Sequence, residues 1–588
     1  MKQFFKFMFA SMLGTILTLL LLFFILVGII AAAMSFTKST VEISDKSVLH
    51  VTFAQAIPDR STDDPFSNFN PASFESMEVT GLKDIMDNLE KAARDNKIKG
   101  IYFEVSSVPA SAATVEELRN ALLKFKESGK WIIAYGEMID QQAYYLASVA
   151  DRIYMHPEGF FLFKGINGEV AFLKGTLDKL GIEAQVIRHG KFKAAVEPLI
   201  QDKMSEANKE QVKTYISALW NQMVDGIADR RNLTQDELNS LANQLSLTDP
   251  GDAVEAGLVD GLRYMDELLD ELADSAGIEA SKDLKLIKLP KYLKAVDPQE
   301  KKIAKDKIAV IYAEGDIVSG KGTDGNVGSE RFAKAIRKAR EDEKVKAIVL
   351  RVNSPGGDGL ASEVIHREII LAKKAKPVVA SFGGVAASGG YYIACGADSI
   401  IASPNTITGS IGVFGVIPNM EKFFNQKLGL TFDRVMTNDH ADFVGVNRPM
   451  NETEKAVLLK QVEDMYDDFI GHVSEGRGIE KAMVDSIGQG RVWAGTDALR
   501  IGLIDKFGGL DDAIRMAAGM AGITEYRISE LPEVKDPFEK FMEMFGSQAR
   551  TKALQQELGY FYPYYTSIKT LTTMQGVQAR MLMDIQVK

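Results

Sequence analysis

The sequence predicts a duplicated α/β protein, with two domains built on mainly parallel sheets behind an N-terminal transmembrane helix. Three observations support this fold class: a long-period repeat, an alternation of β-branched runs with amphipathic stretches, and an uncharged apolar run near the first residue. The repeat has an offset of 247 positions. Solenoid repeats have periods of only about 20 to 50 residues, so an offset this long indicates a duplicated domain.

Two pairs of segments carry the repeat. Ile98–Val105 (IKGIYFEV) matches Val345–Val352 (VKAIVLRV), and Ala143–Asp151 (AYYLASVAD) matches Gly390–Asp398 (GYYIACGAD). Strands that alternate with helices predict βαβ units and a mainly parallel sheet in each copy. In the second copy we expect strands at 308–312, 347–352, 378–382 and 399–402, and helices at 330–340, 359–374 and from 389 onward.

The chain divides into five predicted parts. They are a cytoplasmic tip and membrane anchor (1–40), a first α/β copy (41–289), a lysine-rich linker (290–307), a second α/β copy (308–530) and an extension without a counterpart in the repeat (531–588). The extension is rich in Met, Gln and Tyr, which fits a helical or assembly element and equally a partly ordered tail.

The N-terminal run predicts an uncleaved membrane anchor. Residues 7–36 carry no charge, and about 20 apolar residues span a bilayer. The alternative is a signal peptide cleaved near Ala31–Ala33, but its apolar region is only about 7–15 residues long. Lys2 and Lys6 precede the run, so we expect a single pass of the inner (plasma) membrane, with a cytoplasmic N-terminus and the bulk of the chain on the extracytoplasmic side.

Composition excludes several classes of protein. The 588 residues are 46% hydrophobic and 25% charged, as in an ordinary globular chain, and the net charge of −11 argues against a nucleic-acid partner. Cys395 is the single cysteine, so no intrachain disulfide can form. The sequence has no CxxC or HExxH motif, and its six histidines do not cluster. We therefore expect neither a metal site nor a cofactor.

The two copies differ in two loops that follow strands, where active crevices of parallel sheets lie. The second copy has Ser354-Pro355-Gly356-Gly357 where the first has Ser107-Val108-Pro109-Ala110. Glycine backbone N–H groups at a strand-to-helix turn suit a developing oxyanion, although the same residues also make a plain turn.

The second loop carries one serine among small residues. Ser388 stands in Ala387-Ser388-Gly389-Gly390, at the start of a predicted helix, where the first copy has Gln141. A helix start favours negative charge on the serine oxygen. Alternatively, Ser388 is only a helix N-cap. The first copy argues against this alternative, since Gln141 begins the same helix without a hydroxyl.

A serine nucleophile needs a base, and the sequence offers two. Lys193 lies 52 positions after Gln141, and His440 lies 52 positions after Ser388. Lys193 has mostly apolar neighbours, and burial lowers the pKa of a lysine, so the neutral amine becomes available as a base. It reaches Ser388 only if the two copies meet. We expect Lys191, in the same loop, to be an ordinary surface lysine.

These motifs resemble the signal peptide peptidase A (protease IV) family in its long, duplicated, membrane-anchored form. The resemblance rests on FKAAVEPLI, RVNSPGGD, SFGGVAASGGYYIACGAD and ITGSIGVFG, and implies the fold of the Clp-protease and crotonase group. It implies a Ser–Lys dyad shared between the copies, with Ser388 as the nucleophile and Lys193 as the base. It also implies oxyanion donors at Gly357 and Gly389, next to Gly356, and a bond from Ser410 to the lysine.

The resemblance further implies a membrane-anchored serine endopeptidase that degrades hydrophobic peptides such as cleaved signal peptides. It implies a homotetramer, and no cofactor. Two alternatives remain open at this point. One is a crotonase-like acyl-CoA enzyme, which would use the SPGG loop and need neither Ser388 nor Lys193. The other is a non-catalytic membrane scaffold.

Overall fold

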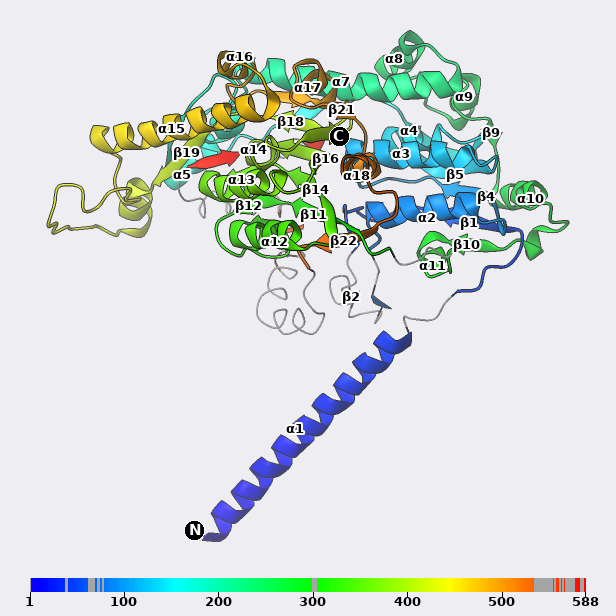
Figure 1. Ribbon diagram of the computed structural model, residues 1–588, viewed down its shortest axis with the longest axis horizontal. Coiled ribbons are helices and arrows are strands. Elements are labelled where there is room, and N and C mark those ends of the chain that lie inside the picture. The colour runs from blue at the N-terminus through cyan, green and yellow to red at the C-terminus, as the bar shows by residue number, and fades with distance from the viewer. Residues whose placement is uncertain are drawn as a thin grey trace.

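The computed structural model contains two α/β bodies and a separate N-terminal helix (Figure 1). It describes residues 2–36, 41–61, 69–70, 75–76, 79–298 and 304–533, and, towards the end of the chain, 554, 557–559, 562, 565, 577–581 and 586–587.

The first copy is built on a six-stranded parallel sheet with the strand order β10-β1-β4-β5-β6-β9. Its strands are β1 (Ser47–Val51), β4 (Ile98–Glu104), β5 (Trp131–Asp140), β6 (Arg152–Leu162), β9 (Gly261–Leu262) and β10 (Leu286–Lys288). Its helices are α2 (Leu82–Arg94), α3 (Ala112–Lys126), α4 (Gln141–Ala147), α5 (Lys174–Leu180), α6 (Glu197–Ile200), α7 (Glu206–Arg231), α8 (Gln235–Gln244), α9 (Pro250–Glu255), α10 (Met265–Ser275) and α11 (Leu289–Tyr292).

The second copy repeats this plan with the order β20-β18-β16-β14-β11-β22, and β17 and β21 branch from β16. All pairs in this sheet are parallel except β18 with β20. Its strands are β11 (Lys307–Glu314), β14 (Val345–Ser354), β16 (Val378–Ala387), β17 (Ser399–Ala402), β18 (Ile407–Gly409), β20 (Val492–Ala494), β21 (Lys506–Phe507) and β22 (Arg527–Leu531). Its helices are α12 (Ser329–Glu341), α13 (Gly359–Lys373), α14 (Gly389–Ala394), α15 (Glu452–Arg477), α16 (Lys481–Ile487), α17 (Gly495–Arg500) and α18 (Leu510–Met520).

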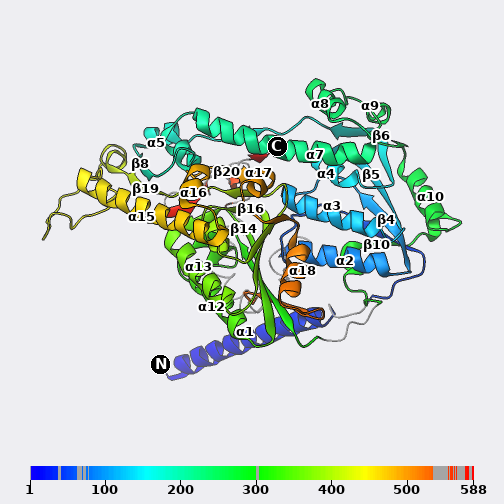
Figure 2. The same ribbon diagram turned by 45° about the horizontal axis from the view of Figure 1, so that its top comes forward.

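Each sheet is covered on both faces, as its continuous apolar strands require. α10 packs on one face of the first sheet and α18 on one face of the second. The larger cores lie on the opposite faces, under α2, α3 and α4 in the first copy and under α12 to α15 in the second. Figure 2 shows the two helical layers side by side.

The duplication predicted from the sequence extends to individual hydrogen bonds. Tyr144 donates through its hydroxyl to the carbonyl of Leu258, 2.6 Å away. Tyr391 does the same to Leu503 at 2.8 Å in the second copy. The two copies are therefore the same domain in three dimensions.

A third sheet joins the copies. Its order is β13-β12-β15-β23-β19-β8, and β8 (Glu183–Arg188) belongs to the first copy whereas β19 (Phe414–Asn419) belongs to the second. These two strands pair antiparallel over six residues each. The other members are β12 (Asp316–Val318), β13 (Asn326–Gly328), β15 (Gly356–Asp358) and β23 (Gln578–Arg580). Smaller pairs join β2 (Phe69–Asn70) to β3 (Glu75–Ser76), and β7 (Gly168–Glu169) to β24 (Gln586–Val587).

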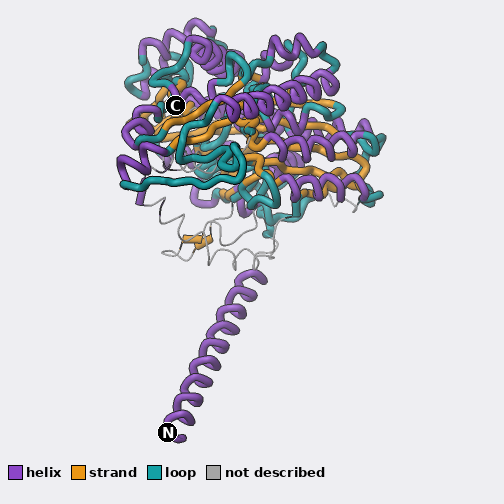
Figure 3. Tube along the Cα trace, turned by 90° about the vertical axis from the view of Figure 1, so that its left-hand side faces the viewer, coloured by secondary structure: helices purple, strands orange, loops and turns teal. Residues whose placement is uncertain are grey.

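The N-terminal helix α1 (Lys2–Phe36) stands apart from the two bodies (Figures 1 and 3). In the part of the chain that the structure describes, it is the one helix long and apolar enough to cross a membrane, over Gln3–Leu22 with a mean hydropathy of 1.9. It is a candidate transmembrane helix, as the sequence predicts.

The elements expected in the second copy are all present, with small differences at their ends. β16 is longer than predicted and runs from Val378 to Ala387, so the strand reaches the residue before Ser388. α11 begins at Leu289, the last residue of the predicted first copy, and extends into the predicted linker to Tyr292, which is fully buried. In the predicted C-terminal extension, β23 pairs with β15 of the second copy and β24 pairs with β7 of the first copy. The sequence pattern predicts no strand in this extension.

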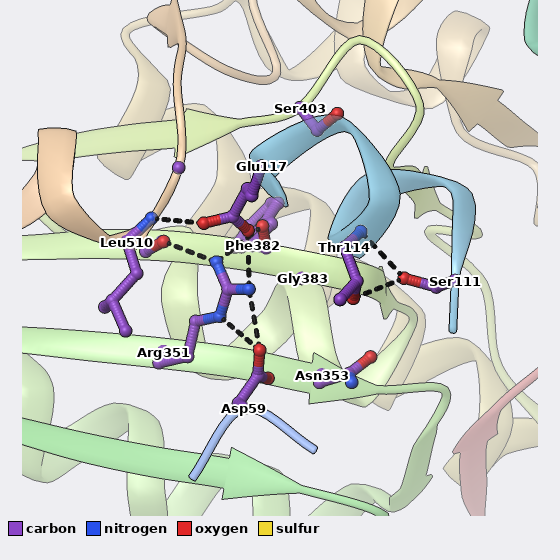
Figure 4. A network of polar contacts seen from close by, with 12 residues as sticks. Asp59, Ser111, Thr114, Glu117, Arg351, Asn353, Phe382, Gly383, Ser403 and Leu510 are labelled. Carbon is purple, nitrogen blue, oxygen red and sulfur yellow. Dashed lines mark hydrogen bonds and ion pairs between the residues drawn. The ribbon is translucent and has the colours of Figure 1, made fainter. Parts of the chain in front are cut away.

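One buried arginine ties the second copy to the first (Figure 4). Arg351 on β14 donates to Asp59 at 2.7 Å and to Glu117 at 2.7 Å, and both carboxylates belong to the first copy. The guanidinium also donates to Ser381 at 3.0 Å on β16. Glu117 accepts in turn from the backbone N–H of Leu510 at 2.8 Å. All three charged side chains are almost fully buried. Water therefore cannot replace a lost partner, and breaking one of these ion pairs leaves a buried charge uncompensated.

We therefore expect Arg351→Met to lower the free energy of unfolding by about 3–5 kcal/mol, because it leaves two buried carboxylates without a cation. Arg515→Met is the matched control: Arg515 bonds Asp512 on the protein surface, and its loss should cost less than about 1 kcal/mol. Urea unfolding followed by circular dichroism measures both. An Arg351→Met midpoint equal to that of the control would contradict the role of this network.

Candidate active site

Lys193 and Ser388, from different copies, meet at the junction of the two bodies. The Lys193 Nζ lies 2.9 Å from the Ser388 Oγ and donates a hydrogen bond to it. Lys193 is 1% exposed and Ser388 is 0% exposed. The two residues singled out by mismatches in the repeat are thus in direct contact.

Ser388 sits at a sharp turn between β16 and α14. Its φ is 53° and its ψ is −118°, a backbone conformation that costs energy for a residue with a side chain and is common at functional sites. The Ser388 N–H donates to the Gly409 carbonyl at 2.8 Å. Its hydroxyl does not cap α14. The N-cap alternative is therefore wrong for Ser388.

The first copy does not by itself exclude a helix cap at the position of Ser388. Gln141 begins α4 without a hydroxyl of its own, but α4 is capped by Asp140, whose side chain accepts from the Ala143 N–H at 2.7 Å. The Gln141 amide instead bonds the backbone of Gly165 at 2.9 Å. In the first copy, Gln141 thus occupies the position that corresponds to Ser388, and its amide has a structural role.

The second copy positions the backbone of Lys193. The strand pairing of β8 with β19 brings the chain across, and the Phe192 N–H then donates to the Gln489 carbonyl at 2.8 Å. Gly490 packs so closely on the lysine that a Cβ built on it would lie 2.6 Å from the Lys193 Cβ. Lys191, two residues earlier, is exposed, as expected.

Two polar residues that the sequence analysis missed hold this loop. Gln211 on α7 donates to the Phe192 carbonyl at 3.2 Å and accepts from the Val492 N–H at 3.2 Å, so it bridges the two copies. Glu197 is buried and accepts from Asn208 at 2.9 Å. The sequence offered one signal for Glu197, namely a carboxylate inside the apolar segment AAVEPLI.

Burial sets the protonation of the lysine. Removal from water lowers the pKa of Lys193 from its ordinary value near 10.5 to about 7. The amine also bonds Ser410, at 3.1 Å to its Oγ and 3.2 Å to its carbonyl oxygen. Ser410 therefore contacts the lysine as the resemblance implied. A large fraction of the amine is neutral near pH 7 and able to accept a proton from the Ser388 hydroxyl.

The predicted oxyanion glycines lie beside Ser388. A Cβ built on Gly389 would lie 3.1 Å from the Gly357 nitrogen, so the backbones of these two residues are adjacent. Gly356 plays a different part. Its N–H donates to the Ser354 Oγ at 3.2 Å, and its φ of 99° requires a glycine. Gly357 and Gly389 therefore remain the candidate donors for a charged oxygen.

His440, the alternative base, lies elsewhere. It is exposed in an irregular turn, where its carbonyl accepts from the Phe443 N–H at 3.1 Å. The equal spacing of 52 residues in the two copies does not bring it to Ser388.

The expectation that the histidines do not cluster is wrong in three dimensions. Glu363 and His366 on α13 and His472 on α15 each offer one ligand atom, and these atoms lie within 4.8 Å of one another. This group could hold a metal ion. Glu363 accepts from the Tyr392 hydroxyl at 2.7 Å and bonds His472 at 3.1 Å. The 106 positions between the two histidines hid the group from sequence reasoning.

A serine bonded to a buried amine, beside two glycine N–H groups, is the arrangement of a serine-type hydrolase. Residues 124–279 and 370–524 each match the model of Peptidase family S49, and together they make up more than half of the chain. The chain belongs to this family, and it contains two S49 domains.

Relatives with known names agree. The chain is 36% identical to Protease 4 of Salmonella typhi over 490 residues, which cover 82% of this chain and 78% of the relative. It is 33% identical to the chloroplastic serine protease SPPA of Arabidopsis thaliana over 507 residues, 85% of this chain and 74% of the relative. ClpP1 of Listeria monocytogenes is a structural neighbour at 16% identity and a TM-score of 0.23, over 34% of this chain and 92% of its own. The family predicted from the motifs is confirmed, and the protein is a serine-type peptidase.

The contact of Gly490 with Lys193 leads to a prediction. Gly490→Ala should reduce kcat/KM for a peptide substrate roughly 100-fold, because the added methyl displaces the lysine from the serine. Gly478→Ala is the matched control. Gly478 has a φ of 65°, close to the 79° of Gly490, but no atom lies within 4 Å of its Cβ position. If both variants lose activity equally, backbone strain and not the position of Lys193 is responsible.

Proposed function

We propose that the protein is a membrane-anchored serine endopeptidase in which Ser388 is the nucleophile and Lys193 the general base. The observation that carries this proposal is the 2.9 Å contact between their side chains across the two copies. It gives a role to both mismatches in the repeat, since one copy supplies the base and the other the nucleophile.

The proposed reaction follows from these positions. Neutral Lys193 takes the Ser388 proton while the serine oxygen attacks a peptide carbonyl carbon. The N–H groups of Gly357 and Gly389 stabilise the oxyanion, and Ser410 holds the lysine in place. Lys193 then protonates the leaving amine, and water releases the acyl group from Ser388.

The surroundings of the site favour extended apolar peptides as substrates. Small residues around Ser388 allow a substrate backbone to approach closely, and β15, which carries Gly357, already pairs along its main chain with an extended segment, β23. We propose hydrophobic peptides, notably signal peptides left in a membrane after cleavage. A crotonase-like acyl-CoA reaction would leave the Lys193–Ser388 contact without a role, and so would a scaffold.

The position of the site in the cell is also a proposal. Lys2 and Lys6 precede the apolar part of α1, which supports a cytoplasmic N-terminus and catalytic domains on the extracytoplasmic side. Protease treatment of spheroplasts tests this, and an intact chain after treatment would contradict it. The homotetramer stays a prediction from the family resemblance.

Ser388→Ala should abolish peptide hydrolysis, and Lys193→Met should reduce it by at least about 10²–10⁴-fold, because the serine loses its base. His440→Ala is the control and should keep nearly full activity, since His440 is exposed and outside the site. Turnover of an apolar peptide and labelling by a serine-reactive phosphonate measure all three. An active Lys193→Met together with an inactive His440→Ala would mean that the dyad lies within one copy.

Activity should depend on pH through the lysine. Because burial lowers the pKa of Lys193 to about 7, the base is protonated and inactive below that pH and neutral above it. We therefore expect kcat/KM to rise through about pH 7 and then level off, and His440→Ala to keep the same profile. A profile that rises only near pH 10, where an exposed lysine titrates, would contradict a buried base.

A further inference from the structure

Three side chains of the second copy bring one carboxylate and two imidazoles together. Glu363 and His366 lie one turn apart on α13, and His472 lies on α15. α14 packs against both of these helices (Figure 1). The Glu363 Oε2 lies 3.1 Å from the His472 Nε2, and the centroids of the two imidazole rings are 4.3 Å apart. Tertiary packing forms this group, because its helices are far apart in the sequence.

The first copy holds a cation at the equivalent place. Arg119 on α3 corresponds to His366 at the repeat offset of 247 positions. Its guanidinium donates to the carbonyl oxygens of Tyr145 on α4 and Gly226 on α7, both at 2.6 Å. Arg119 is almost fully buried. A single buried cation therefore links three helices in the first copy.

The acidic partner of this cation is present in both copies. The Glu116 carboxylate accepts from the Tyr145 hydroxyl in the first copy, and the Glu363 carboxylate accepts from the Tyr392 hydroxyl at 2.7 Å in the second. The second copy thus keeps the pair of glutamate and tyrosine but has His366 in place of the arginine.

His472 supplies a second imidazole from the third helix. α7 and α15 are each 26 residues long and match end to end, which places His472 at the position of Gly226. The second copy has therefore replaced the guanidinium, and the glycine that it reaches, with two histidines. Histidine is the commonest metal ligand in proteins.

The buried histidine has little else to bond. His366 is almost fully buried, and among the described residues the only hydrogen-bond contact of its ring is with the Cys395 Sγ, 3.9 Å from the Nε2. Sulfur is a weak hydrogen-bond partner. The side chains of Glu363 and His472 are partly exposed, so an ion can reach the group from water.

We propose that Glu363, His366 and His472 bind one Zn²⁺ ion, with water as the fourth ligand. Imidazole nitrogens and a carboxylate are ligands that zinc prefers, and a tetrahedral site holds its ligand atoms about 3.4 Å apart. The 3.1 Å between Glu363 and His472 is close to this separation, and all three ligand atoms lie within 4.8 Å of one another. The ion takes the role that Arg119 has in the first copy.

The ion stabilises the packing around the helix that follows Ser388. Tyr392 lies on α14, which begins directly after the serine, and its hydroxyl bond to Glu363 connects α14 to the metal ligands. A ligand that binds only the folded state raises the melting temperature. None of the three ligands takes part in the proposed reaction, so the metal site does not depend on the proposed function.

Zinc binding to the full-length protein in detergent tests the site. The chain is produced without a histidine tag and treated with EDTA, and Zn²⁺ is added in a calorimetric titration. We expect one Zn²⁺ per chain, bound at micromolar concentration, together with a higher melting temperature. No binding at that concentration would overturn the proposal. Excess Mg²⁺ should not displace the ion, because imidazole ligands disfavour Mg²⁺, and displacement would overturn the ligand assignment.

His472→Gln and Glu363→Gln each remove one ligand and keep a polar side chain. Each should weaken Zn²⁺ binding at least about 100-fold and abolish the rise in melting temperature. His50→Gln is the matched control and should bind zinc like wild type, since His50 bonds Glu104 at 2.7 Å in the first copy. Wild-type binding by His472→Gln would place the zinc elsewhere and overturn the proposal.

The double variant His366→Arg with His472→Gly tests the comparison between the copies, because it recreates the pair Arg119 and Gly226. Without metal it should melt at least as high as metal-free wild type, and Zn²⁺ should no longer raise its melting temperature. A double variant that responds to Zn²⁺ as wild type does would contradict the proposed ligands.

Discussion

The structure depends on keeping one amine out of water. In the proposed mechanism Lys193 accepts the Ser388 proton only when the amine is neutral, and burial lowers its pKa to about 7. The hydrogen-bond partners of the Lys193 amine, Ser388 and Ser410, and the close glycine Gly490 all belong to the second copy. The docking of the copies is therefore part of the chemistry.

That docking is built from rigid contacts of different kinds. β8 and β19 share main-chain hydrogen bonds, which fix the register of the lysine loop against the second copy. Arg351 fixes the other side of the junction through Asp59 and Glu117, three residues before the SPGG loop begins at Ser354. Gln211 links the lysine loop to β20. The backbone pairing sets the position of one copy relative to the other, and the buried ion network makes separation of the copies energetically costly.

The sequence predicted the features that a repeat or a period reveals. The strands and helices of the second copy follow from apolar periodicity, and Ser388 and Lys193 follow from places where the copies disagree. Features that depend on long-range contact left no such signal. Gln211 resembles any polar residue on an exposed helix, and Arg351 resembles a charge at a strand end. The tail strand Gln578–Arg580 has no β-branched residue at all, so its pairing comes entirely from the strands that receive it.

The split of the site has a consequence for the order of synthesis. The ribosome completes the copy with Lys193 well before it reaches Ser388, and domains tend to fold as they emerge. A first copy that has folded alone carries an amine still open to water and therefore protonated, and it carries no nucleophile. Under the proposed mechanism, a nascent or truncated chain is therefore inert, and hydrolysis begins only when the second domain packs over the lysine. In this mechanism the division of the site between the copies delays proteolysis until both copies have folded and docked.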